Sequence, residues 1–384
     1  MKDPISDRVK NVPPSGIRRY FDLAAKSKNI VSLGVGEPDF DTPYEIKELA
    51  ARAIELNRTH YTSNSGLFEL RNRISEKLAR ENNIQAENEN ILITAGSSEG
   101  LDIVLRALLD PRDEVLIPEP CYVAYEPLTM LAGGKAIFVP SKEENEFRVT
   151  VDGLKAAASE KSKALLICSP NNPTGGVLRK SDLEEIADFA VENDLVVISD
   201  EIYEKLIYEE KHVSIASLNG MAERTITLNG FSKAFACTGW RVGYIAGPEK
   251  LIAPIRKIHQ YNLLCAPSIS QYAMLAAFEP GIEESVDSMV RAYDRRRRLL
   301  VGGLNKLPGI ECHMPAGAFY AFPNISGTGM SDGEFTEKAI TDAEVAVVPG
   351  SVFGPSGKDH VRCSYSVSAS NITKALERLG DLLS

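Results

Sequence analysis

The segment LVVISDEIY (residues 195–203) begins with four apolar residues in succession and ends in polar ones. An unbroken apolar run is typical of a strand buried on both faces, as in a parallel sheet covered by helices. Similar short runs, most of them apolar at successive positions, recur at residues 91–96, 114–120, 135–140, 163–170, 225–230 and 242–247. Several stretches between them have helical periodicity, most clearly 98–109 and 181–194. The alternation predicts an α/β fold whose large domain holds a mostly parallel seven-stranded sheet sandwiched by helices.

The pattern changes after Ala266 and Pro267, which indicates a second, smaller α/β domain. We expect the N-terminal segment to pack with it, so that the small domain is split around a continuous large one. The predicted units are an N-terminal segment that is part of the small domain (1–45), a large ligand-binding domain (46–285) and a small C-terminal domain (286–384).

Two local features also give expectations. Ser181 and Glu184 fit a capping box at the start of a helix. A long helical pattern from about residue 283 to 306 contains RRRR (295–298). We expect these arginines to form a solvated cationic face, with Asp294 paired to Arg298 one helical turn later.

The composition limits the kinds of partner. A net charge of −10 disfavours nucleic acid and anionic membranes as main partners. No apolar run reaches the length of a membrane-spanning helix, and the N-terminus lacks the apolar core of a signal peptide. The six cysteines form no C-x-x-C pair, so we expect reduced thiols and a cytoplasmic protein. The five histidines lack metal-ligand spacing, and no metal is expected.

In open α/β sheets, ligands bind beyond the carboxyl ends of the strands. Gly96 is followed there by Ser97, Ser98 and a predicted helix, which can form an anion cradle or an ordinary helix cap. Asn172 precedes Pro173, so its backbone is held extended and its amide is presented rigidly. The alternative for Asn172 is a plain turn.

Charged residues follow two further runs. Asp200, at the end of a buried strand, needs a cationic partner or several hydrogen bonds, unless it caps a helix. Lys233 lies among small and apolar residues, so we expect its pKa to be lowered, as suits a nucleophile for Schiff-base chemistry. The alternative is a surface lysine whose apolar stem packs on the protein. Arg241 follows in a glycine-bracketed segment.

One ligand accounts for this set of side chains. It carries a phosphate, a ring nitrogen that prefers to be protonated, a ring hydroxyl and an aldehyde. Pyridoxal 5'-phosphate has all four, and a lysine Schiff base with an aspartate on the pyridinium nitrogen is its expected arrangement. The sequence therefore predicts this cofactor.

Four stretches carry a family resemblance, namely VSLGVGEPDFDTP (31–43), SPNNPTGG (169–176), SDEIYE (199–204) and GFSKAFACTGWRVGY (230–244). Together they closely resemble the class I aminotransferases of the pyridoxal-phosphate fold type I superfamily, over nearly the whole chain. They look most like the archaeal and bacterial branch of aspartate or aromatic-amino-acid aminotransferases. The resemblance implies ping-pong transamination between an L-amino acid and a 2-oxo acid such as 2-oxoglutarate.

The resemblance also implies roles for single residues around the cofactor ring. Lys233 would form the internal aldimine and then move the proton between Cα and the cofactor. Asp200 would stabilise the pyridinium. Asn172 and Tyr203 would bind the ring hydroxyl, and Tyr122 would stack on the ring.

Further roles concern the phosphate and the substrate. The phosphate would be held by a set of four residues of the same chain, Ser97, Ser98, Ser232 and Arg241. Tyr61 would reach the phosphate of the neighbouring subunit, so the resemblance implies a homodimer. Arg362 would bind the substrate α-carboxylate through its planar fork, and Gly36 would approach the same carboxylate.

The chain departs from this pattern at two positions. Gly230 stands where many relatives have a serine that binds phosphate, and Ser98 stands where some aspartate-preferring relatives have a lysine. The preferred amino donor therefore stays open. A C–S β-lyase on the same fold is an alternative. A ligand-sensing regulator is a remote one, because regulators of that kind usually carry a DNA-binding module before the domain and a net charge of −10 disfavours nucleic acid as a partner.

Overall fold

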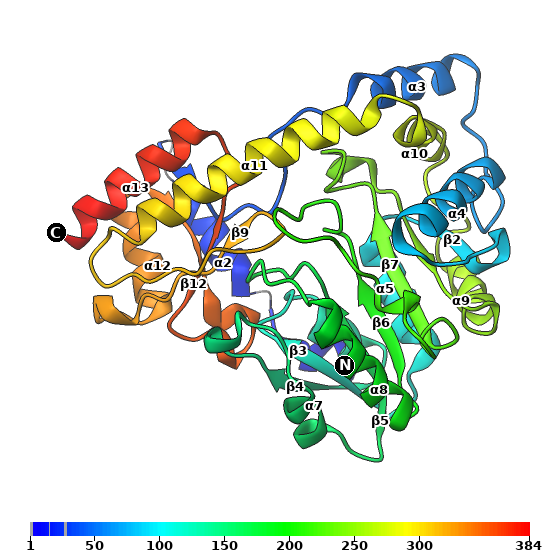
Figure 1. Cartoon of the computed structure of the whole chain (residues 1–384), viewed down its shortest axis with the longest axis horizontal. Helices are drawn as coiled ribbons and strands as arrows, with labels where there is room; N and C mark the ends of the chain where they lie inside the picture. Colours follow the sequence, from blue (N-terminus) through cyan, green and yellow to red (C-terminus); the bar gives the residue numbers. More distant parts are fainter. Residues whose placement is uncertain (1–2, 15, 27–28) are drawn as a thin grey trace.

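The computed structural model describes residues 3–14, 16–26 and 29–384 (Figure 1). The seven apolar runs form one sheet in the order β2-β8-β7-β6-β5-β3-β4. Only β8 runs against its neighbours in this sheet, so the predicted mostly parallel seven-stranded sheet is confirmed. The strands are β2 Ile91–Thr94, β3 Glu114–Glu119, β4 Lys135–Pro140, β5 Ser162–Cys168, β6 Val196–Asp200, β7 Thr225–Gly230 and β8 Gly243–Ala246.

Helices cover both faces of this sheet. On β5, Leu165 packs in a cluster with α7 (Val151–Ala157) and α8 (Lys180–Glu192). The next residue, Leu166, packs on the other face with α5 (Ser97–Leu108) and α9 (Glu249–Asn262). Successive side chains of a strand point to opposite faces, and both leucines are buried because helices cover both faces. Sandwiching of the sheet by helices is therefore confirmed.

Other helices pack around the sheet and the second unit (Figure 1). A third cluster joins the β2–β8 edge to the helices α3, α4 and α10. The helices not yet bounded are α1 Asp7–Asn11, α2 Gly16–Ala24, α3 Tyr44–Glu55, α4 Phe68–Asn82, α6 Tyr125–Leu131, α10 Ser268–Ala273, α11 Ile282–Leu304, α12 Asp332–Thr341 and α13 Ala369–Leu383. No helix in the described ranges is both long and apolar enough to cross a membrane.

The C-terminal part forms a smaller α/β unit. Its antiparallel strands are β9 (Tyr320–Ala321), β11 (Val348–Pro349) and β12 (Val361–Ser364), with β12 in the middle. The N-terminal strand β1 (Val31–Ser32) pairs in parallel with β10 (Val345–Ala346), which joins the two ends of the chain. The division into 1–45, 46–285 and 286–384 stays a prediction, and its second boundary falls inside α11.

The start of α8 differs from the prediction. The helix begins at Lys180 with Arg179 as its cap residue, and the backbone N–H of Arg179 donates to Asp182 Oδ2 at 2.8 Å. The predicted pair Ser181 and Glu184 therefore lies inside the helix. Asp182 is fixed as the capping partner because it also accepts from Arg148 at 2.7 Å.

The arginine run on α11 is the second correction. Arg298 pairs with Asp294 at 3.2 Å, as predicted. Arg297, however, is fully buried, and its guanidinium donates to Asp294, to Glu209 and to the carbonyl oxygen of Pro315. It also lies 4.4 Å from the ring centre of Tyr208. A buried guanidinium needs such partners, and sequence spacing alone does not reveal them.

Replacement of this buried arginine tests the packing of α11. We expect Arg297→Met to lower the free energy of unfolding by about 1–3 kcal/mol, because the carbonyl oxygen of Pro315 loses its donor. Arg298→Met is the matched control on the exposed side and should cost less than about 1 kcal/mol. Urea unfolding of both variants measures the difference, and equal losses would contradict the assignment.

Candidate active site

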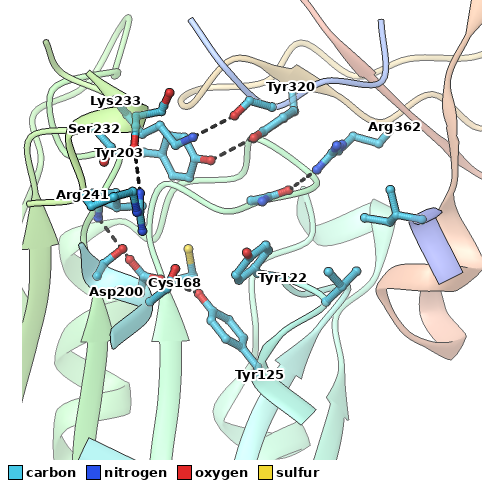
Figure 2. A pocket seen from close by; sticks show the side chains of 18 of the residues that line it. Tyr122, Tyr125, Cys168, Asp200, Tyr203, Ser232, Lys233, Arg241, Tyr320 and Arg362 are labelled. Atoms are coloured by element: carbon cyan, nitrogen blue, oxygen red, sulfur yellow. Dashed lines mark hydrogen bonds between the residues drawn. The ribbon is translucent and has the colours of Figure 1, made fainter. Parts of the chain in front are cut away.

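A cavity of about 640 Å³ lies at the carboxyl ends of the parallel strands (Figure 2). Its wall contains every predicted site residue except Tyr61, namely Gly36, Ser97, Ser98, Tyr122, Asn172, Asp200, Tyr203, Ser232, Lys233, Arg241 and Arg362. The two ends of the chain contribute Gly36 and Arg362, while the sheet side contributes the others. The sheet and the smaller unit therefore build the site together.

Asp200 ends β6 and is buried. Its carboxylate accepts from the hydroxyl of Tyr125 at 2.8 Å and from the backbone N–H of Ile202 at 3.2 Å. The residues directly after Asp200 form a turn and not an α-helix, so Asp200 is not a helix cap. Burial raises the pKa of Asp200 to about 6, although the hydroxyl of Tyr125 opposes this. No described residue forms an ion pair with this carboxylate, so a cation in the cavity would be strongly favoured.

Lys233 extends into the same cavity from the loop after β7 (Figure 2). Its Nζ donates to the carbonyl oxygen of Gly36 at 2.7 Å. Burial lowers the pKa of Lys233 to about 8, and the nearby positive charges of Arg362 and Arg241 lower it further against the opposing charge of Glu37. The amine is therefore available as a nucleophile or base near neutral pH.

The start of α5 can hold an anion. Gly96 is the cap residue, with φ +82°, and Ser97 and Ser98 open the helix. The positive φ favours glycine, and a Cβ there would also lie 2.6 Å from a guanidinium nitrogen of Arg241, which would have to move. Arg241 itself donates to the carbonyl oxygens of Thr238 and Ala95. Free backbone N–H groups, two hydroxyls and a guanidinium thus lie on one side of the cavity.

Arg362 lies on β12 and is buried at the opposite side (Figure 2). Its two terminal nitrogens donate to Asn172 Oδ1 at 2.9 Å and to the carbonyl oxygen of Gly34 at 2.7 Å. The guanidinium also faces the rings of Tyr320 and Phe353. Its Nε is buried and has no partner among the described residues. The two printed bonds use only part of the guanidinium's five N–H donors, so terminal N–H groups remain for a ligand.

The NNPTGG turn separates two asparagines by function. Asn171 makes the turn, because its Oδ1 accepts from the backbone N–H and the hydroxyl of Thr174. Asn172 instead lines the cavity, where it holds Arg362. The plain-turn interpretation therefore applies to Asn171 and not to Asn172.

Tyrosines missed by sequence reasoning complete the wall. Tyr320 lies on β9, and its hydroxyl is 2.9 Å from that of Tyr203. A Cβ on Gly36 would lie 2.3 Å from the Tyr320 hydroxyl, so position 36 has room only for glycine. Tyr125 follows Tyr122 by three residues in EPCYVAYEP, and this spacing was the available signal. The other lining residues not predicted are Ile17, Arg18, Val123, Cys168, Ile202 and Thr238.

A buried polar network fixes the turn that carries Tyr203. The carboxylate of Glu201 accepts from the hydroxyls of Ser199 and Ser214 and contacts the ring of His212. Glu204 forms an ion pair with Lys77, which lowers the pKa of Glu204 to about 2 against the effect of burial. These bonds hold the chain after β6 in one conformation, which positions Tyr203 in the wall.

Tyr61 is the one predicted site residue outside the cavity. Its side chain is 80% exposed. Its role toward a neighbouring subunit stays a prediction.

The Tyr125 hydroxyl gives a pH prediction. Tyr125→Phe removes a donor to the charged form of Asp200, so the pKa of Asp200 should rise by about 1. In the folded protein without ligand the pKa of Asp200 is about 6, whereas the ordinary pKa of an aspartate, which applies to the unfolded chain, is 3.8. The stability of the folded protein should therefore fall as the pH rises from 3.8 to about 6. In Tyr125→Phe this fall should continue to a higher pH.

Carbon-13 NMR titration of the aspartate carboxyl groups measures the pKa directly. Tyr122→Phe is the control, because the Tyr122 hydroxyl forms no hydrogen bond with Asp200. A pKa that stays the same or falls in Tyr125→Phe would contradict the proposed effect.

Comparisons with known proteins agree with this geometry. The family model described as "Aminotransferase class I and II" matches residues 28–379. The chain is 51% identical to the aspartate aminotransferase of Pyrococcus abyssi, and the alignment covers 99% of this chain and 98% of the relative. It is 48% identical to aromatic-amino-acid aminotransferase 2 of Thermococcus litoralis, again over 99% and 98%. The solved structure of aspartate aminotransferase from Thermus thermophilus with maleate has a TM-score of 0.94 at 38% identity, covering 99% of this chain and 100% of that one. The chain therefore belongs to the class I and II aminotransferase family.

Proposed function

We propose that this protein transfers an amino group between an L-amino acid, aspartate or aromatic, and a 2-oxo acid such as 2-oxoglutarate, with pyridoxal 5'-phosphate as cofactor. The observation that carries the proposal is the shared cavity of Lys233, whose pKa is lowered, and Asp200, a buried carboxylate. Relatives named aspartate and aromatic-amino-acid aminotransferase support this reaction over a C–S β-lyase or a regulator.

The residues of the cavity fit this cofactor. A protonated ring nitrogen would give Asp200 the cation that no described residue supplies. The start of α5 with Ser97, Ser98 and Arg241 would suit a phosphate, aided by Ser232. Tyr122 lines the cavity where an aromatic ring would stack. These assignments rest on charge and hydrogen-bonding capacity.

Lys233 is assigned the proton transfer. When bound, the cofactor supplies an aldehyde for the amino group and a ring that draws electrons from the substrate Cα. Nζ of Lys233, with a pKa of about 8, can take the Cα proton as a base and return it as an acid. Its bond to the Gly36 carbonyl oxygen holds the amine toward the substrate side of the cavity.

Arg362 is assigned the substrate α-carboxylate. Its buried guanidinium is held by Asn172 and Gly34, and these two bonds leave other N–H donors of the group unused. A carboxylate in the cavity would accept charge-assisted hydrogen bonds from the unused N–H donors. Gly36 is assigned to the substrate α-carboxylate as well. Tyr203 and Asn172 are assigned to the hydroxyl of the cofactor ring. Binding on Arg362 would orient Cα toward Lys233.

We further propose a homodimer in the cytoplasm, with Tyr61 of each subunit completing the neighbouring site. The exposed side chain of Tyr61 supports this, because an aromatic ring 80% exposed in one chain is available to a second copy. A partner reaching the phosphate through Tyr61 would make each site dependent on two subunits.

Replacement of the lysine tests the proposed function. Lys233→Ala should lower kcat by about 10²–10⁴-fold, because no other base is assigned to the Cα proton. Lys163→Ala, at a partly exposed lysine paired with Asp113, is the control and should keep its activity. Borohydride reduction and peptide mapping of the wild type should place a pyridoxyl label on Lys233. A label elsewhere, or a variant with most of its activity, would contradict the assignment.

Hybrid dimers test the shared site. A Lys233→Ala subunit mixed with a Tyr61→Phe subunit should form one site with both native residues, so activity should recover relative to either homodimer. Activity is measured after the hybrid has been verified by its mass or affinity tags. Absence of recovery in verified hybrids would place Tyr61 in the site of its own chain.

A further inference from the structure

The cavity wall contains a cation to which the proposed function assigns no role. Arg18 on α2 lines the cavity together with Ile17. The side chain of Arg18 is exposed, and no described residue forms a hydrogen bond or ion pair with it. The next residue, Arg19, instead pairs with Glu337 of α12 at 3.1 Å. The two neighbouring arginines therefore have different surroundings.

Helix α2 is held in place by contacts with the smaller unit. Ile17 packs against a cluster that contains Phe353 and Val348. A Cβ on Gly16 would lie 2.8 Å from Cγ1 of Val352, so the start of the helix is in close contact. Tyr20 packs with a second cluster on α12. These contacts fix the face of α2 that carries Arg18, so its place in the cavity wall follows from packing.

The charges of the lining residues are unequal. Four cationic side chains, Arg18, Lys233, Arg241 and Arg362, share the wall with one acidic side chain, Asp200, among the described lining residues. The proposed function assigns Lys233, Arg241 and Asp200 to the cofactor and Arg362 to the substrate α-carboxylate. One cation is then left over, and it matches a ligand with one more anionic group.

We propose that Arg18 binds the second carboxylate of a dicarboxylic substrate. The site would then accept aspartate, glutamate and their 2-oxo acids through a contact made by the chain's own N-terminal helix. This inference rests on the proposed function and names its substrate class.

The apolar lining of the cavity explains how other donors would fit. Ile17, Val123 and Tyr122 line the cavity and offer apolar surface. An aromatic side chain can pack there without using Arg18, whereas a carboxylate placed there without the guanidinium would lose water with no partner. Arg18 therefore affects dicarboxylic substrates selectively.

The first test is a pair of neighbouring substitutions in the cofactor-loaded enzyme. Arg18→Met should lower kcat/KM of the half-reaction with aspartate by about 10- to 100-fold, because a charge-assisted hydrogen bond is lost. The same constant with phenylalanine should stay within about twofold. Arg19→Met, which breaks only the pair with Glu337, should leave both constants unchanged. The change in cofactor absorbance measures each half-reaction.

Binding without reaction gives a second readout. Maleate carries two carboxylates, and isocrotonate has the same shape with a methyl group in place of one. Calorimetric titration of the loaded enzyme should show that Arg18→Met weakens maleate by about 10-fold or more and leaves isocrotonate unchanged.

The outcomes separate the two proposals. A wild-type enzyme that reacts with neither aspartate nor phenylalanine would overturn the proposed function. A wild-type enzyme that reacts, combined with an Arg18→Met variant that loses both substrates equally or loses neither, would overturn the role of Arg18 alone.

Discussion

A buried carboxylate without a cation is the constraint on which the rest of the site depends. Asp200 sits at the end of a central strand, covered by protein, and its partners among the described residues are the Tyr125 hydroxyl and the backbone N–H of Ile202. Burial raises its pKa to about 6, so the folded chain disfavours this charge until a cation enters. A protonated ring nitrogen is such a cation, and the geometry therefore favours a pyridine cofactor.

The other groups are arranged around that carboxylate by two different parts of the chain. Lys233 and the start of α5 come from the sheet side, whereas Gly36 and Arg362 come from the smaller unit. The bond from Lys233 to the Gly36 carbonyl oxygen crosses between them. Gly36 and Arg362 are proposed to contact the substrate, and the sheet side is proposed to contact the cofactor, so both parts of the chain would contact the bound ligands.

Much of the site was predictable because parallel strands bring their carboxyl ends to one edge. Asp200, Asn172 and Lys233 each follow a recognisable apolar run, so their meeting in one cavity follows from topology. Tyr125 and Arg18 were not predictable in this way. Tyrosines and arginines at such positions are common in helices, and only the packing of α6 and α2 turns these two toward the cavity.

The sequence by itself determined the order of strands and helices, the parallel sheet and the chemical kinds of group at its edge, because periodicity and residue type are local properties. Only the tertiary structure decided which groups share a wall and which partners they have. It buried Arg297 where periodicity predicted a solvated face, and it gave Arg18 no partner among the described residues beside an Arg19 that is paired. The physical reason is that burial and pairing depend on contacts between residues far apart in the chain.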